Sequence, residues 1–206
     1  MPKLFHAPGS CSNGILLLLE ETGVTYEIES IDLAKGGQRA PAYLAQNPKG
    51  KVPALRTEDG QMVTEFPAVA YWIATAYPQA GLWPDDPLGQ VRTLEMLDFI
   101  VGSVHMRGFT FLKMPQKFLG DPEGQAALRA HGRQEIEKGL AVMADTLGAQ
   151  EYMLGRFGPA DAAAFYVLRW CEMDNIAMPD NLAALHARLA DRPAVHHIAP
   201  KLTRSV

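Results

Sequence analysis

The pattern of hydrophobic positions changes about 80 residues into the chain. Before that point short apolar runs are separated by turn signals, whereas after residue 88 apolar residues recur at helical spacing over long stretches. Between the two regions lies a cluster of prolines and glycines, from Pro78 to Pro87, which ends one helix and cannot lie within the next. The sequence therefore predicts two domains, residues 1–80 and 88–206, joined by a linker at about 80–87.

The first domain is predicted to alternate strands and helices. In order, we expect a strand at residues 3–6, a helix that ends before Gly23, a strand at 26–31, a short helix at about 41–45, a hairpin of 52–55 and 62–64, and a helix from about 67 to 77. Residues 26–31 alternate apolar and polar side chains, which is typical of a half-buried strand. Asp59-Gly60 favours the hairpin because this pair readily takes the backbone angles of a tight turn.

The second domain is predicted to be an all-helical bundle. Four sets of apolar residues follow helical spacing: Leu94, Leu97, Val101 and Val104; Ile136, Leu140, Met143 and Leu147; Phe165, Leu168 and Cys171; Leu182, Leu185 and Leu189. The predicted fold class is therefore an α/β N-terminal domain followed by an all-α C-terminal bundle.

Composition and charge exclude several classes of protein. Of the 206 residues 48% are hydrophobic and 20% are charged, which is ordinary for a globular protein and argues against disorder. The net charge is −4 with no dense basic cluster, so we expect no nucleic-acid partner. The longest apolar runs, such as residues 162–168, fall short of the roughly 18 residues of a membrane span, and no secretory signal is seen. We therefore expect no membrane association and a cytoplasmic location.

Neither the cysteines nor the histidines indicate a metal site. The two cysteines, Cys11 and Cys171, form no Cys-x-x-Cys pair, which disfavours a disulfide framework and a thiolate zinc site. His196 and His197 are adjacent, so on a helix their side chains point in different directions. We expect no bound metal, and we expect Cys171 to be a core residue.

Cys11 is the residue most suggestive of chemistry. It follows the first predicted strand and stands at the start of the first predicted helix. Unpaired N–H groups and the helix dipole at such a position stabilise an anion, which predicts a lowered thiol pKa and a reactive thiolate. The alternative is that Cys11 is a small buried residue, as free cysteines often are.

Four motifs in the right order carry a resemblance to a known family. They are Ala-Pro-Gly-Ser-Cys-Ser at 7–12, Asn-Pro-Lys-Gly-Lys-Val-Pro-Ala-Leu at 47–55, Thr-Glu-Phe-Pro-Ala at 64–68 and Ala-Asp at 160–161. With these motifs the whole chain resembles the cytosolic glutathione transferases of the bacterial beta class. The resemblance implies a thioredoxin-like N-terminal domain that binds glutathione, a helical domain that forms most of the second-substrate pocket, and a homodimer.

The resemblance also implies roles for individual residues. Cys11 lies near the glutathione sulfur, and in that class can form a mixed disulfide with it; the Ser10 and Ser12 hydroxyls are further candidate thiolate stabilisers. The backbone of Val52 is implied to pair with the cysteinyl residue of glutathione, and the peptide bond before Pro53 is implied to be cis. Glu65 and the Phe66 backbone are implied to contact the γ-glutamyl end of glutathione, and Lys35 and Lys51 are candidates for its glycyl carboxylate. His105 resembles a histidine that reaches toward the cysteine and glutathione. Asp98 aligns near a polar residue of that site. Glutathione carries one ammonium and two carboxylates, which need opposite charges or N–H donors.

Three positions depart from the family pattern. Phe66 stands where relatives carry Ser or Gly, so a hydroxyl contact to glutathione is lost. Asp98 replaces the usual Asn, which exchanges an amide donor for a carboxylate that only accepts. Gly158 takes the N-cap position before Asp161, which leaves the capping box half present.

The leading hypothesis is a glutathione transferase that joins the glutathione thiolate to small, mostly apolar electrophiles. The second is a glutathione-dependent thiol-disulfide oxidoreductase, because Cys11-Ser12-Asn13-Gly14 resembles a thioredoxin motif with Gly14 in place of the second cysteine. The third is a non-catalytic protein that binds glutathione or an apolar ligand, motivated by Phe66 and Asp98. Residues expected to line an apolar pocket are Met106, Phe109, Phe111, Met114 and Trp170.

Overall fold

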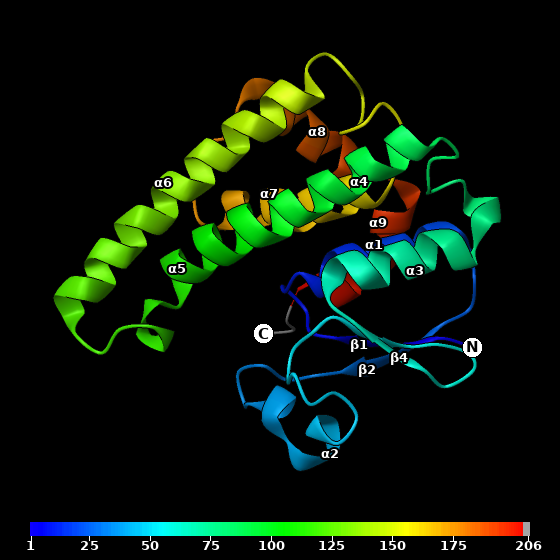
Figure 1. Ribbon diagram of the computed structural model, residues 1–206, viewed down its shortest axis with the longest axis horizontal. Coiled ribbons are helices and arrows are strands. Elements are labelled where there is room, and N and C mark those ends of the chain that lie inside the picture. Colours follow the sequence, from blue (N-terminus) through cyan, green and yellow to red (C-terminus); the bar gives the residue numbers. More distant parts are fainter. Residues whose placement is uncertain (204–206) are drawn as a thin grey trace.

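The first part of the protein is built on a four-stranded mixed sheet (Figure 1). The computed structural model describes residues 1–203. Its strands are β1 (Lys3–His6), β2 (Glu27–Ser30), β3 (Ala54–Arg56) and β4 (Met62–Thr64), in the order β2-β1-β3-β4. β1 pairs parallel with β2, while β3 runs antiparallel to both β1 and β4. This is the thioredoxin-like arrangement that the resemblance implies.

Helices cover both faces of this sheet. α1 (Ser12–Thr22) and α3 (Phe66–Ala76) lie on one face, and α2 (Pro41–Leu44) lies on the other, after a turn of 3-10 helix η1 (Gly37–Arg39) (Figure 1). Successive side chains of a strand point to opposite faces. Leu4 of β1 therefore joins the large core beneath α1 and α3, whereas Phe5 packs against Tyr43 of α2 in a smaller cluster.

The rest of the described chain is helical. Its elements are η2 (Pro78–Ala80), α4 (Pro87–Phe99), η3 (Ile100–Phe109), α5 (Thr110–Lys113), η4 (Pro115–Lys117), α6 (Pro122–Leu147), α7 (Pro159–Met173), α8 (Asp180–Ala190) and α9 (Pro193–Leu202). The expected α/β part followed by an all-α part is confirmed. The predicted end of the second domain, at residue 206, lies outside the described residues. No helix among residues 1–203 combines the length and the apolar character that crossing a bilayer requires.

η3 is a π-helical segment that joins α4 to α5 without a break, so that the three form one long rod beside α6 (Figure 1). The sequence predicts an ordinary helix here from Leu94, Leu97, Val101 and Val104. The π form instead bonds each N–H to a carbonyl five residues back, which widens the turn. From this segment Val101, His105 and Met106 all line the same cleft.

α7 connects the helical part to the sheet part. It is buried along most of its length and packs against α1, α3 and α4. The approach to α1 is close enough that a Cβ at Gly14 would collide with the Ala162 carbonyl oxygen and meet the Phe66 ring at 2.9 Å. The residue in place of a second thioredoxin cysteine is thus a glycine that this packing requires.

Within the first 77 residues the boundaries of the predicted elements agree with the structure to within one or two residues, whereas the 3-10 turns, α5 and α9 had no counterpart among the predictions. The half capping box at α7 is also as predicted: Gly158 has no side chain to offer, while the Asp161 carboxylate accepts from the Gly158 N–H at 3.0 Å and from the Met153 N–H at 2.8 Å. Asp161 is 1% exposed. The carboxylate therefore fixes the start of α7 and the loop before it.

Candidate functional site

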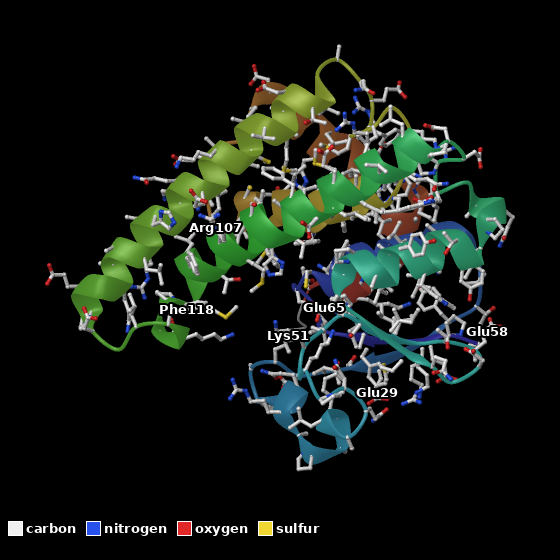
Figure 2. All side chains as sticks on the ribbon, viewed as in Figure 1. Glu29, Lys51, Glu58, Glu65, Arg107 and Phe118 are labelled. Atoms are coloured by element: carbon white, nitrogen blue, oxygen red, sulfur yellow. The ribbon has the colours of Figure 1, made fainter. Side chains whose placement is uncertain are left out.

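A cleft of about 130 Å³ lies where the sheet part meets η3. Its walls come from four regions of the chain: the start of α1, the loop before β3, the turn from β4 into α3, and η3. The residues are Cys11, Asn47, Lys49, Lys51, Val52, Pro53, Thr64, Glu65, Phe66, Val101, His105 and Met106. In Figure 2, Lys51 and Glu65 lie at the centre of the molecule beside this cleft, whereas Glu58 lies far from them at the hairpin.

The Cys11 thiol lies at the inner end of the cleft and is 8% exposed. Its S–H donates to the Val52 carbonyl oxygen at an Sγ to O distance of 3.5 Å. Burial raises the pKa of the Cys11 thiol to about 12, against the smaller lowering effect of the backbone N–H groups of Cys11 and Ser12. The predicted low pKa is therefore wrong, because loss of hydration outweighs the helix N-terminus. The thiol is a hydrogen-bond donor at neutral pH.

The loop that carries Cys11 is held by a buried chain of hydrogen bonds. The ring of His6 is bonded through Nε2 to the Lys201 carbonyl at 2.9 Å and through Nδ1 to the Ser12 hydroxyl at 2.7 Å. The Ser12 Oγ is in turn 2.7 Å from the Ser10 Oγ. Burial lowers the pKa of His6, so the ring is neutral at pH 7.

The directions of these bonds follow from their ends. A carbonyl only accepts, so Nε2 of His6 carries the proton and Nδ1 accepts from the Ser12 O–H. The proton between the serines then comes from Ser10. The Ser10 hydroxyl, predicted as a thiolate stabiliser, directs its proton toward Ser12 and is not among the cleft-lining residues.

The end of α9 fastens the same loop from outside. The Leu202 carbonyl accepts from the Gly9 N–H at 2.9 Å and from the Asn13 side-chain amide at 3.0 Å. From α7, the Trp170 indole N–H donates to the Gly9 carbonyl at 2.8 Å. Residues nearly 200 positions apart in sequence therefore fix the place of Cys11.

The wall next to Cys11 is shaped by buried polar groups. Asn47 is 1% exposed, and its amide donates to the Lys51 carbonyl at 2.9 Å, while the Tyr43 hydroxyl donates to the same carbonyl at 2.6 Å. The following Val52–Pro53 peptide bond is cis, as the resemblance implies. This arrangement leads the backbone of Val52 along the cleft beside Cys11.

The outer cleft carries two lysines and one glutamate. Lys49 and Glu65 form an ion pair with 2.9 Å between Nζ and Oε1, and Lys51 lines the same cleft. Glu65 has a backbone φ of 73° at the N-cap of α3, a left-handed conformation that costs a non-glycine residue about 1–3 kcal/mol. The packing of α3 maintains this conformation, which holds the carboxylate at the cleft.

An aromatic cluster forms the floor of the cleft on the helical side. His105 of η3 lines the cleft, and its ring contacts Tyr166 and Trp170 of α7 at centroid distances of 5.6 and 4.9 Å. The Phe66 ring is turned into the core against Tyr166, at 5.2 Å. Burial, and to a smaller extent the charge of Lys51, lowers the pKa of His105 to about 4. His105 is therefore a neutral imidazole at physiological pH.

Several predicted site residues do not meet in this cleft. The Lys35 side chain is 87% exposed and pairs with Asp32, and Asp98 is exposed on α4. Of the residues expected in an apolar pocket, Met106 lines the cleft, whereas Phe109 and Trp170 are core residues. Cys171 is fully buried, as expected.

Two residues at the site, Lys49 and Tyr166, are not among the predicted site residues. Lys49 belongs to the motif at 47–55 and carries a charge suited to an anionic ligand, so the signal was present. The sequence signal for Tyr166 was weaker: it is a single hydroxyl within an apolar run, which the structure shows to be buried. Within residues 1–203, no group of three or more His, Cys, Asp and Glu side chains is arranged to hold a metal ion.

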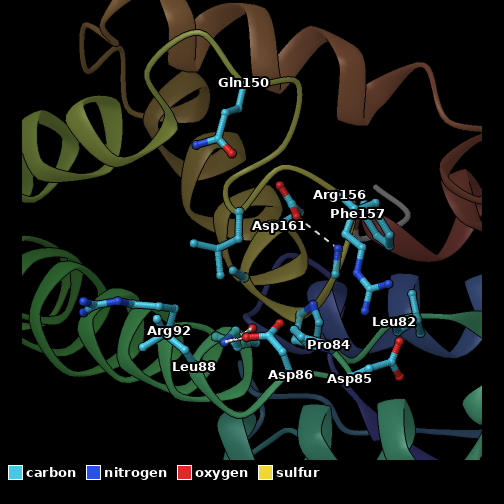
Figure 3. A pocket seen from close by; sticks show the side chains of 16 residues that line it. Leu82, Pro84, Asp85, Asp86, Leu88, Arg92, Gln150, Arg156, Phe157 and Asp161 are labelled. Carbon is cyan, nitrogen blue, oxygen red and sulfur yellow. Dashed lines mark hydrogen bonds between the residues drawn. The ribbon is translucent and has the colours of Figure 1, made fainter.

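A larger hollow of about 620 Å³ lies between the start of α4 and the segment leading into α7 (Figure 3). None of the predicted site residues lines it. Its buried and capping carboxylates are already used: Asp86 accepts from the Gly89 N–H at 2.7 Å and Asp161 from the Gly158 N–H. The cleft at Cys11 is therefore the better candidate for chemistry.

Known proteins resemble the chain over most of its length. The family described as the glutathione S-transferase N-terminal domain matches residues 9–76. Glutathione S-transferase GstA of Escherichia coli O157:H7 is 34% identical over 198 residues, which cover 94% of each chain. A solved bacterial beta-class glutathione S-transferase of Sphingomonas chungbukensis is 31% identical with a TM-score of 0.81, covering 98% of this chain and 100% of that one. A glutathione transferase homolog from Sulfitobacter, with bound glutathione, is 26% identical with a TM-score of 0.88 and 98% coverage of both chains. The chain therefore belongs to the glutathione S-transferase family, with bacterial and beta-class members among its relatives.

Proposed function

We propose that the protein is a glutathione transferase that binds glutathione in the cleft at Cys11 and joins its sulfur to a small, mostly apolar electrophile. The observation that carries the proposal is the charge pattern of the cleft. Two ammonium groups, on Lys49 and Lys51, and one carboxylate, on Glu65, complement the two carboxylates and one ammonium of glutathione. The bound glutathione of the Sulfitobacter relative supports the same assignment.

Each end of the tripeptide has a suitable partner in this arrangement. Glu65 receives the γ-glutamyl ammonium, and the N–H of Phe66 at the start of α3 receives the neighbouring carboxylate. Lys51 receives the glycyl carboxylate, and the Val52 backbone pairs with the cysteinyl residue. Because Lys49 now holds Glu65, the ammonium of the ligand competes with Lys49 for that carboxylate, and the freed Lys49 becomes a second partner for a ligand carboxylate.

The reacting sulfur lies among neutral donors. The Cys11 S–H exchanges its bond to the Val52 carbonyl for one to the glutathione thiolate, and so lowers the pKa of the bound thiol. Val101 and Met106 give the cleft an apolar wall on its helical side, which favours an apolar second substrate. Positioning of the two reactants and stabilisation of the anion then provide the rate enhancement.

Calorimetry and a conjugation assay test the proposal together. Glutathione is titrated into the wild type, Glu65→Gln and the matched control Glu58→Gln, and turnover is followed with chlorodinitrobenzene, an activated aryl chloride. Loss of a charged partner lowers glutathione affinity about tenfold or more in Glu65→Gln, with little change in Glu58→Gln. No binding to the wild type at several millimolar glutathione, or equal affinities in all three proteins, would contradict the proposal.

Thiol-disulfide exchange is the second candidate, since Cys11 stands in a thioredoxin-like position. It requires a thiolate, and the raised pKa of Cys11 leaves the thiol protonated at neutral pH. Disulfide reduction well above a glutathione blank, abolished in Cys11→Ser, would favour this activity over conjugation. Turnover of any electrophile would exclude the non-catalytic alternative.

We also propose a homodimer formed through α4 and α3. Leu88, Val91 and Leu94 follow one another at three-residue spacing on α4 and are 63%, 56% and 44% exposed, and Tyr71 of α3 is 47% exposed. Exposed apolar side chains in this number on neighbouring helices favour a second copy as the partner. Light scattering is expected to give the dimer mass for the wild type and the monomer mass for Val91→Glu, whereas a monomeric wild type would refute the assembly.

A further inference from the structure

The Tyr166 hydroxyl is a buried polar group directly beneath the cleft. Tyr166 is 0% exposed, and its ring is enclosed by Phe66 on one side and Trp170 on another, at centroid distances of 5.2 and 4.9 Å. Its hydroxyl lies 3.3 Å from Nδ1 of His105. Within residues 1–203 the Tyr166 hydroxyl makes no other hydrogen bond.

The direction of this bond follows from what each group can do. If Nδ1 carried the proton, it would donate to the tyrosine oxygen, and the tyrosine O–H would be left buried without an acceptor, at a cost of about 1–3 kcal/mol. If the tyrosine donates instead, both groups are satisfied and the ring proton is on Nε2. Burial keeps the pKa of Tyr166 well above its ordinary value, so its proton stays in place.

We propose that Tyr166 is a positioning residue that holds neutral His105 in the tautomer whose Nε2–H donates into the cleft. Nδ1 is occupied by Tyr166, while the ring lines the cleft and Nε2 makes no hydrogen bond within residues 1–203. The Trp170 ring packs against the imidazole at 4.9 Å and limits its rotation. The arrangement fixes which nitrogen faces the substrate and which protonation state it has.

The role of this donor rests on the proposed glutathione site. A neutral N–H facing the cleft stabilises a sulfur anion there without adding a permanent positive charge. Because the other nitrogen is bonded, the ring arrives with its donor already oriented. Tyr166 therefore acts on the reaction through His105, since its own hydroxyl is fully buried and is not among the groups that line the cleft.

The first test observes the tautomer itself. The ring nitrogens of ¹⁵N-histidine-labelled protein are recorded by NMR for the wild type, Tyr166→Phe and the control Tyr71→Phe, with His105→Gln to assign the signals. We expect His105 to carry its proton on Nε2 in the wild type and in Tyr71→Phe, and to become a mixture of both tautomers in Tyr166→Phe. A wild-type proton on Nδ1, or an unchanged ring in Tyr166→Phe, would overturn the proposal.

The second test asks whether Tyr166 acts through His105. We expect Tyr166→Phe to lower kcat for conjugation about tenfold with an unchanged KM for glutathione, the loss of one oriented donor bond. In the His105→Gln background the same substitution is expected to have no further effect on kcat. An equal loss in both backgrounds would assign Tyr166 a purely structural role and refute the proposal.

These readouts separate the inference from the function on which it rests. Absence of glutathione binding by the wild type would refute the proposed function, while the nitrogen signals still decide whether Tyr166 fixes the tautomer. The native fold of each variant is checked by the dispersion of its remaining NMR signals.

Discussion

The protonated state of Cys11 leads to a prediction about its reactivity. A pKa of about 12, against an ordinary value of 9.0, lowers the thiolate fraction at pH 7.5 about a thousandfold. Alkylation requires the thiolate, so we expect the small ionised fraction to slow the modification of Cys11 by iodoacetamide up to about a thousandfold relative to a free thiol of ordinary pKa, with part of this factor offset by the greater nucleophilicity of a more basic thiolate. The rate is measured on the peptide that contains Cys11. The Cys11→Ala protein serves as the control, because in it only the buried Cys171 can be modified.

The pH dependence separates ionisation from access to the reagent. A buried thiolate of low pKa would react slowly at every pH, and its rate would reach a plateau above its pKa. A thiol with a pKa of about 12 reacts about tenfold faster with each pH unit up to pH 10 and shows no plateau. A plateau below pH 8.5 would show that the helix N-terminus dominates, and would refute the argument from burial.

The neutral state of the Cys11 thiol also determines the effect of removing it. In conjugation Cys11 contributes one hydrogen bond to an anion, so Cys11→Ala is expected to retain activity with kcat/KM lowered about tenfold. Disulfide reduction through Cys11 would be lost entirely. Complete loss of both conjugation and glutathione affinity in Cys11→Ala would contradict the assisting role.

Three further predictions concern the scaffold and its titration. Asp161→Ala removes the acceptor of two buried backbone N–H groups and is expected to lower the free energy of unfolding by about 2–3 kcal/mol in urea titrations, with Asp161→Asn intermediate; an unchanged midpoint would contradict this. His105 has a folded pKa of about 4 against 6.5 when unfolded, so the unfolded chain binds more protons between these values, and stability is present above pH 6.5 and lost as pH falls toward 4. This slope is expected to weaken in His105→Gln, and an equal slope in both proteins would exclude His105 as its source. Gly14→Cys, which restores a thioredoxin motif, is expected to lower Tm strongly and to form no disulfide with Cys11, because the added Cβ meets Ala162 and Phe66; a stable, oxidisable variant would refute this.

The elements of the fold could be predicted because their signals are local. The alternation at 26–31, the Asp59-Gly60 turn and the helical spacing around Ile15 each reflect contacts within a few residues. The loop at 47–55 is also a short segment and contains both the buried Asn47 and the cis proline, although the cis form is implied by the family resemblance and not by the local pattern. Features that one short segment builds by itself are therefore the ones that the sequence predicts best.

The chemistry of the site depends on contacts that no local pattern records. The pKa of Cys11 is set by burial, and its loop is closed by the end of α9 and by Trp170 of α7. The π segment η3 also packs against a distant part of the chain: Gly132 of α6 approaches so closely that an added Cβ would lie 2.7 Å from the Gly108 carbonyl oxygen. The predicted low pKa failed because the position at a helix start was visible in the sequence and the burial was not.

Burial has opposite effects on the pKa values of Cys11 and His105, and the result is the same for both. It raises the pKa of the thiol to about 12 and lowers that of the imidazole to about 4, so both groups are neutral hydrogen-bond donors at pH 7. The charged groups, Lys49, Lys51 and Glu65, stand at the cleft wall on the sheet side, where the ends of a charged tripeptide need them. A sulfur anion bound between Cys11 and His105 would meet two neutral donors, while the charge of Lys51 also acts on both groups. Such an anion is stabilised enough to form and remains free enough to react, which is the balance that transfer of a thiolate requires.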